Sequence, residues 1–136
     1  MILTMLYPVR KTIYNALTAS TALMALVTGV YDDIPDETAF PYIIFEGVAE
    51  SRNDRMADYG SDIRITLCVW SKYKGMSEAE EILKEMNNVL DYKDLSTSLS
   101  TDINYWEMCR WENTTKIDMN DGFTRGLAVS YRCLVS

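Results

Sequence analysis

The spacing of the hydrophobic residues predicts two helices near the start of the chain. Apolar side chains recur every three or four positions over about residues 5–18, which places them on one face of a helix. They are Leu6, Val9, Ile13 and Leu17. Ser20 or Thr21 can cap a short second helix, and Gly29 ends it. Residues 12–31 carry no charge, but their polar side chains favour two short helices over one membrane span.

A third helix is predicted to begin at Ser77 and to end near Tyr92. Ser77 and Glu80 have the spacing of a capping box, in which the serine hydroxyl accepts a backbone N–H and the glutamate reaches back. An apolar stripe follows at helical spacing. It consists of Ala79, Ile82, Leu83, Met86, Val89 and Leu90.

Four strands are predicted from alternating or β-branched runs. The clearest covers residues 63–70, where apolar and polar side chains alternate with a strict period of two. The other three cover about residues 41–49, 105–112 and 124–134. In the last strand, one face is expected to carry Leu127, Val129, Tyr131 and Cys133. Residues 113–122 are expected to form a polar turn that ends in Asn-Asp-Gly.

The order of these elements is helix, helix, strand, strand, helix, strand, strand. It predicts an α+β fold with a mostly antiparallel sheet of about four strands, helices packed on one face and a long inter-strand loop. No repeat, linker or low-complexity tract divides the chain. We therefore expect a single domain over residues 1–136.

The composition removes most catalytic chemistry. The 136 residues contain no histidine, which excludes histidine-based nucleophilic catalysis and histidine-ligated zinc. The formal net charge of −7 argues against a protein that binds nucleic acid through a basic face. The cysteines, Cys68, Cys109 and Cys133, are expected to be buried, unreactive thiols, and a three-thiolate metal site would require the fold to bring their strands together. We expect neither an enzyme nor a bound cofactor.

Two acidic segments are candidates for a charged site. The first is a connector without a neighbouring base or apolar pocket, and we expect it to form a solvated acidic cluster. Its members are Asp32, Asp33, Asp36 and Glu37. The second, residues 118–122, is similar to a calcium loop, but Ala128 stands where the bidentate glutamate would be, so the calcium interpretation fails.

The predicted loop over residues 50–61 has a composition suited to contact with a partner. It is longer than ordinary hairpin connections, and it mixes both signs of charge with two large apolar side chains. Its candidate interface residues are Arg52, Asp54, Arg55, Met56, Asp58 and Tyr59. We expect this loop to order on assembly; the alternative is a solvated connection between strands.

Five short segments, in this order along the chain, resemble the tail-completion proteins of long-tailed bacteriophages, also called tail terminators or tail-to-head joining proteins. The segments are Ile13-Tyr14-x-Ala16-Leu17, Val30-Tyr31-Asp32-x-x-Pro35, Phe40-Pro41-Tyr42-Ile43, residues 65–71 with Gly75, and Asp121-Gly122-x-Thr124-Arg125-Gly126. The likeness spans nearly the whole chain, although each segment alone is weakly specific. Together with the size, it is closest to a joining protein of a phage of Gram-positive bacteria.

The resemblance implies a virion structural protein without enzymatic activity. Such a protein is expected to be monomeric when free and to form a homohexameric ring on the tail tube, at the head-proximal end. Its implied partners are the tail tube protein and the head-completion (stopper) protein of the connector, with DNA in transit through the ring and no membrane. The acidic cluster would suit the bore or the surface of such a ring, because like charge keeps the duplex from sticking. Before assembly the protein would lie in the host cytoplasm.

Two alternatives stay open at this stage. The first is a small cytosolic ligand-binding module or enzyme with a pocket under the sheet. The second is a tail-assembly chaperone that leaves before the virion is complete.

Overall fold

The structure is a computed structural model that describes residues 6–33, 39–52, 60–72, 76–93, 106–118 and 124–135. Within these ranges the chain forms three helices and five strands. The helices are α1 (Leu6–Ala19), α2 (Thr21–Met24) and α3 (Ser77–Leu90). The strands are β1 (Val30–Tyr31), β2 (Tyr42–Arg52), β3 (Ser61–Ser71), β4 (Trp106–Asp118) and β5 (Arg125–Val135). None of the described helices is long and apolar enough to cross a bilayer.

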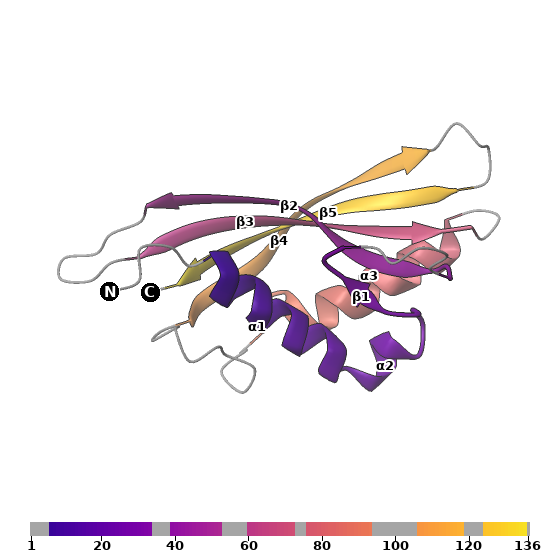
Figure 1. Cartoon of the computed structure of the whole chain (residues 1–136), viewed down its shortest axis with the longest axis horizontal. Helices are drawn as coiled ribbons and strands as arrows, with labels where there is room; N and C mark the ends of the chain where they lie inside the picture. The colour runs from indigo at the N-terminus through magenta and orange to yellow at the C-terminus, as the bar shows by residue number, and fades with distance from the viewer. Residues whose placement is uncertain are drawn as a thin grey trace.

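The described strands form one sheet in the order β1-β2-β3-β5-β4, and the helices lie together on one side of it (Figure 1). Every strand pair is antiparallel except β1 with β2, which is parallel. This arrangement confirms the predicted α+β class. The added strand, β1, has only two residues, so it leaves no periodic signal in the sequence. Backbone bonds hold it in place, including Ile43 N–H to the Gly29 carbonyl at 3.1 Å.

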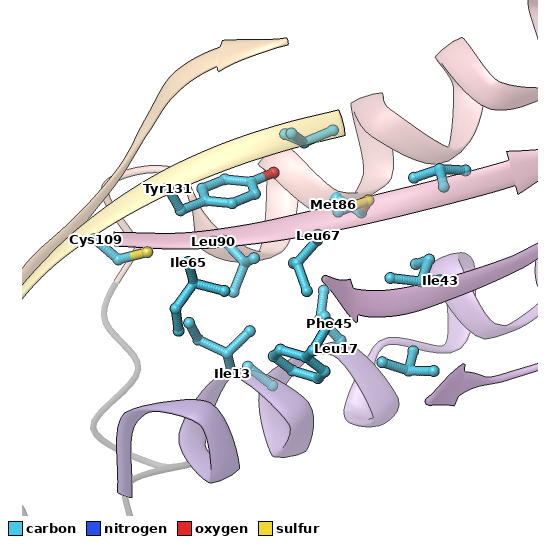
Figure 2. Packing of buried hydrophobic residues seen from close by; sticks show 14 of the residues in the cluster. Ile13, Leu17, Ile43, Phe45, Ile65, Leu67, Met86, Leu90, Cys109 and Tyr131 are labelled. Atoms are coloured by element: carbon cyan, nitrogen blue, oxygen red, sulfur yellow. The ribbon is translucent and has the colours of Figure 1, made fainter. Parts of the chain in front are cut away.

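The core lies between the sheet and the helices. The predicted inward positions of β3 and β5 are all buried, and the apolar stripes of α1 and α3 pack against them (Figure 2). Among the described residues, Tyr131 of β5 is the largest fully buried side chain. Its hydroxyl donates a hydrogen bond to Oδ1 of Asn87 at 2.6 Å, which ties β5 to α3.

β4 is longer than the sequence predicts. It continues to Asp118, through residues that we assigned to a polar turn. A β-bulge between Trp111 and Asn113 adds one residue, and beyond it the polar segment still pairs with β5 down to Asp118 opposite Arg125. The assignment was wrong because ladder hydrogen bonds along a partner strand outweigh the weak strand propensity of exposed polar residues.

Strands β2 and β3 both extend into the segment, residues 50–61, that the sequence predicts as a loop. β2 runs to Arg52 and β3 starts at Ser61, and these two residues face each other as the last pair of the ladder. Ser61 is buried, and its hydroxyl donates a hydrogen bond to Oε2 of Glu50 at 2.8 Å. The ladder pair and this hydrogen bond therefore fix the two strands of the hairpin at Arg52 and Ser61.

The capping box predicted at Ser77 does not form. Helix α3 has Met76 at its N-cap with no side-chain cap bond, and Ser77 is the first helical residue and is exposed. A neighbouring glutamate takes a different partner: Oε1 of Glu78 accepts a hydrogen bond from the Ser71 hydroxyl at 2.6 Å. At α2, by contrast, the predicted cap is confirmed, because Ser20 accepts from Leu23 N–H at 3.2 Å.

We therefore expect the Ser77→Ala variant to be no less stable than the parent protein. Ser77 makes no cap bond that the substitution could remove, and alanine has a higher helix propensity than serine by roughly 0.5 kcal/mol. Thermal melts of the two proteins measure the effect. A clear fall in melting temperature would mean that Ser77 caps the helix in solution.

Candidate assembly surface

The face of the sheet opposite the helices is open. None of the described helices covers it, as Figure 1 shows. Because side chains alternate along a strand, the residues between the buried positions of β3 and β5 point to this side. On β3 these are Asp62, Arg64, Thr66, Cys68 and Trp70, and on β5 they are Gly126, Ala128, Ser130, Arg132 and Leu134. We call this surface the open face.

An arginine row crosses one end of the open face. In the strand register Arg64 of β3 lies opposite Arg132 of β5, and Arg132 lies opposite Arg110 of β4. Like charges at directly opposed positions repel each other, so this arrangement needs compensating groups. Asp62 and Glu112 supply them.

The strongest of these ion pairs is bidentate. Nε of Arg132 donates to both carboxylate oxygens of Asp62 at 3.0 and 3.1 Å, and Nη2 donates to Oδ2 at 2.7 Å. The hydrogen bonds from Arg132 hold the pKa of Asp62 below its usual value. Because this pKa is lower in the folded protein than in the unfolded chain, the pair stabilises the fold at neutral pH. That contribution is lost as the pH falls through the folded-state pKa.

The other two arginines are less completely satisfied. Glu112 is 3.5 Å from Nη2 of Arg110 and 3.8 Å from Nε of Arg64. The side chain of Arg64 is 63% exposed, so its interaction with Glu112 is weak. Nε of Arg110 is buried and has no hydrogen-bond partner among the described residues. The row thus keeps unused donors.

Aromatic side chains gather at the other end of the open face. Tyr42 packs edge-on to Tyr31, with centroids 6.1 Å apart, and against Phe40, at 5.0 Å. Trp70 lies against Gly126, where a Cβ atom would come within 2.8 Å of the indole ring. Gly126 therefore leaves room for the indole ring, and a side chain at this position would displace it.

An acidic pocket lies among the helices, away from the open face. It has a volume of about 440 Å³ and lies between the end of α2 and the start of α3. Its walls combine apolar groups, Leu26 and Ile82, with the carboxylates of Glu78 and Glu81. The neighbouring Glu80 is exposed as well. This pocket can accept a cation that carries an apolar stem.

The structure reaches only part of the predicted interface loop. Arg52 is described and exposed at the end of β2, whereas Asp54, Arg55, Met56, Asp58 and Tyr59 lie outside the described residues. Within the predicted acidic cluster, Asp36 and Glu37 also lie outside them. Asp32 and Asp33 are exposed, as expected, and Asp32 forms an ion pair with Arg10 of α1 at 3.0 Å. Asp32 thus has a basic neighbour that the sequence did not indicate.

The cysteines are buried, as predicted, but they do not meet as a set of three. Cys109 and Cys133 lie in the core with their sulfur atoms 3.3 Å apart, whereas Cys68 points to the opposite side of the sheet. Burial, reinforced by Glu46, raises the pKa of Cys68 to about 11, so this thiol stays protonated at neutral pH. Among the described residues no group of three potential metal ligands comes together.

The arginine row is the feature that sequence reasoning missed. Each arginine occupies a polar position of its strand, which is a readable signal. Their alignment, however, depends on the pairing register of β3, β5 and β4, and a single sequence does not give that register.

Comparison with known proteins identifies the family. The family model for Tail completion protein gp17 matches residues 11–136, which is nearly the whole chain. The chain belongs to this family. It is therefore a tail completion protein, a structural component of a phage-like virion and not an enzyme. The predicted resemblance to tail-completion proteins is confirmed at this level.

The fold is shared with a virion protein of known structure. A chain from the structure titled "Virion of native gene transfer agent (GTA) particle" superposes with a TM-score of 0.86. The match covers 98% of both chains at 19% sequence identity, so it shows a common fold and no more. No match is found among curated proteins. Family membership sets aside the alternative of a small enzyme.

Proposed function

We propose that this tail completion protein forms a ring on the head-proximal end of the tail tube, stops growth of the tube there and joins the tail to the head. The observation that carries the proposal is the family match over residues 11–136. The open face gives it physical support, because the described strands place there an exposed arginine, Arg64, and a partly accessible aromatic side chain, Trp70, without a covering helix. Arginine and aromatic residues are enriched at protein interfaces.

The proposed partners follow from this role. They are the tail tube protein on one side, the stopper protein of the head connector on the other, and further copies of this chain in a homohexamer. DNA passes through the ring without being held. In this proposal the 136 residues act as one domain, and the cluster of Asp32, Asp33, Asp36 and Glu37 lies on the bore or the outer surface. Neither comparison supports a Gram-positive host, which stays a prediction.

The free protein is expected to be monomeric, with the tube end acting as the template for the ring. Its formal charge of −7 makes identical subunits repel one another until partner contacts compensate. Light scattering at micromolar concentration should therefore report a monomer. Purified tail tubes should then capture the protein at one end only, visible as a ring by negative-stain electron microscopy and as co-sedimentation.

Two outcomes would contradict this picture. A chain that does not sediment with tail tubes would overturn the ring function, and a stable hexamer in free solution would overturn the requirement for a template. The remaining alternative, a chaperone that leaves during assembly, makes a different prediction, because it would be absent from purified particles. Mass spectrometry of complete virions separates the two.

A further inference from the structure

The arginine row has a local charge opposite to that of the whole protein. Arg64, Arg110 and Arg132 face two carboxylates, Asp62 and Glu112, so the row keeps a net charge of about +1 on a chain of −7. Repulsion between arginines at opposed positions destabilises the folded chain, and these side chains do not belong to its hydrophobic core. Such a cost is offset where an acidic partner binds.

The choice of basic residue also favours an interface. The described open-face positions of β2, β3 and β5 include arginine and no lysine. Arginine presents a planar fork of donors that fits a carboxylate, and it is enriched at protein interfaces, whereas lysine is depleted there. Arg64 is the most exposed member of the row, at 63%, and can reach outward.

The acidic pocket complements this row in charge and shape. Glu78 and Glu81 face the same cavity of about 440 Å³, and Leu26 and Ile82 supply apolar walls. An arginine stem can pack against those walls while its guanidinium binds the carboxylates. Among the described residues neither Glu78 nor Glu81, the two carboxylates of the pocket, forms an ion pair. The pocket therefore offers unpaired negative charge.

We propose that Arg64, at the exposed end of the arginine row, binds the acidic pocket of a second copy of this chain. The inference rests on the proposed ring, and it names the contact between subunits. The open face and the acidic pocket lie on opposite sides of the sheet, so the contact joins different surfaces of two identical subunits. A head-to-tail contact of this kind closes into a ring when its rotation closes.

DNA is a less suitable occupant of the row. Asp62 and Glu112 lie among the arginines and neutralise most of their charge. A phosphate backbone would be repelled by these carboxylates and would release few counterions from a surface of about +1. A carboxylate pocket with apolar walls, in contrast, can use the guanidinium of a single exposed arginine.

Disulfide trapping tests the contact without any tail. Ala49→Cys and Ser77→Cys proteins, which keep Arg64 and both pocket carboxylates, are mixed under mild oxidation; Ala49 is exposed opposite Arg64, Ser77 is exposed at the pocket wall, and the native cysteines are buried. We expect the mixed disulfide dimer in roughly tenfold excess over dimers from Ala49→Cys with Lys11→Cys, a matched exposed control on α1. The excess should disappear near about 1 M salt, where screening is short-ranged. Equal yields from both mixtures would overturn the proposal.

A second measurement needs no added cysteine. Weak self-association of the wild-type chain, followed by sedimentation equilibrium at high concentration, should fall in Arg64→Glu and in Glu81→Arg and return in the double variant. If the double variant does not recover self-association, the proposed contact is wrong. The contact is also wrong if the wild-type chain binds a short DNA duplex and Arg64→Glu abolishes that binding. If the mixed disulfide dimer forms but the chain does not bind tail tubes, the proposed ring function is wrong and the contact stands. If the chain binds tail tubes but the mixed dimer does not form, only the contact is wrong.

Discussion

Replacing Tyr131 by alanine is expected to lower the free energy of unfolding by about 3–5 kcal/mol. Tyr131 is fully buried and lies between Ile65 of β3 and Trp111 of β4 in the strand register. Removing the ring leaves a cavity that the surrounding sheet can fill only in part, and it leaves Asn87 without its hydrogen bond. Since native domains are stable by only about 5–15 kcal/mol, the loss is a large fraction of the total.

Two further variants separate the causes of this loss. Tyr131→Phe keeps the ring and removes only the hydroxyl, so we expect a cost of about 1 kcal/mol. Tyr7→Ala removes an aromatic side chain that is 58% exposed on α1, and the change should stay within about 0.5 kcal/mol. Urea denaturation of the four proteins measures the series. A Tyr131→Ala protein as stable as Tyr7→Ala would mean that the core around β5 is not packed as described.

Shortening the connection between β2 and β3 is expected to abolish the joining of tails to heads while leaving the fold intact. Residues 53–59 would be replaced by Gly-Ser, with Gly60 retained, which gives a three-residue hairpin connection between Arg52 and Ser61. The ladder pair of these two residues and the bond from Ser61 to Glu50 stay in place. The melting temperature should therefore remain close to that of the parent. We propose that the removed side chains contact a neighbouring subunit or the tail end.

The readout is the state of particles in lysates, viewed by electron microscopy. We expect separate full heads and tails in place of joined virions. A control of the original length, with residues 53–59 changed to glycine and serine, tells whether length or side chains matter; we expect it to fail as well. Parental yields of intact particles from the shortened variant would show that the segment only connects the two strands.

Local patterns in the sequence determined the helices and the central strands. The three-to-four spacing in α1, the serine cap of α2 and the strict alternation in β3 each depend on residues close together in the chain. Burial of one face stabilises such a pattern, so Ile63, Leu67 and Val129 could be assigned to the core before the structure was known.

The remaining features were decided by contacts between distant segments. β1 exists only because residues 30–31 lie beside β2, and β4 extends past its predicted end only because β5 offers a ladder. The capping box at Ser77 did not form; Met76 is at the N-cap, and Glu78 accepts a bond from Ser71 of β3. The arginine row requires three strands in one register, and the acidic pocket requires α2 beside α3. Neighbouring residues in the sequence do not determine which distant segments lie side by side, because that depends on which surfaces pack together in the folded chain.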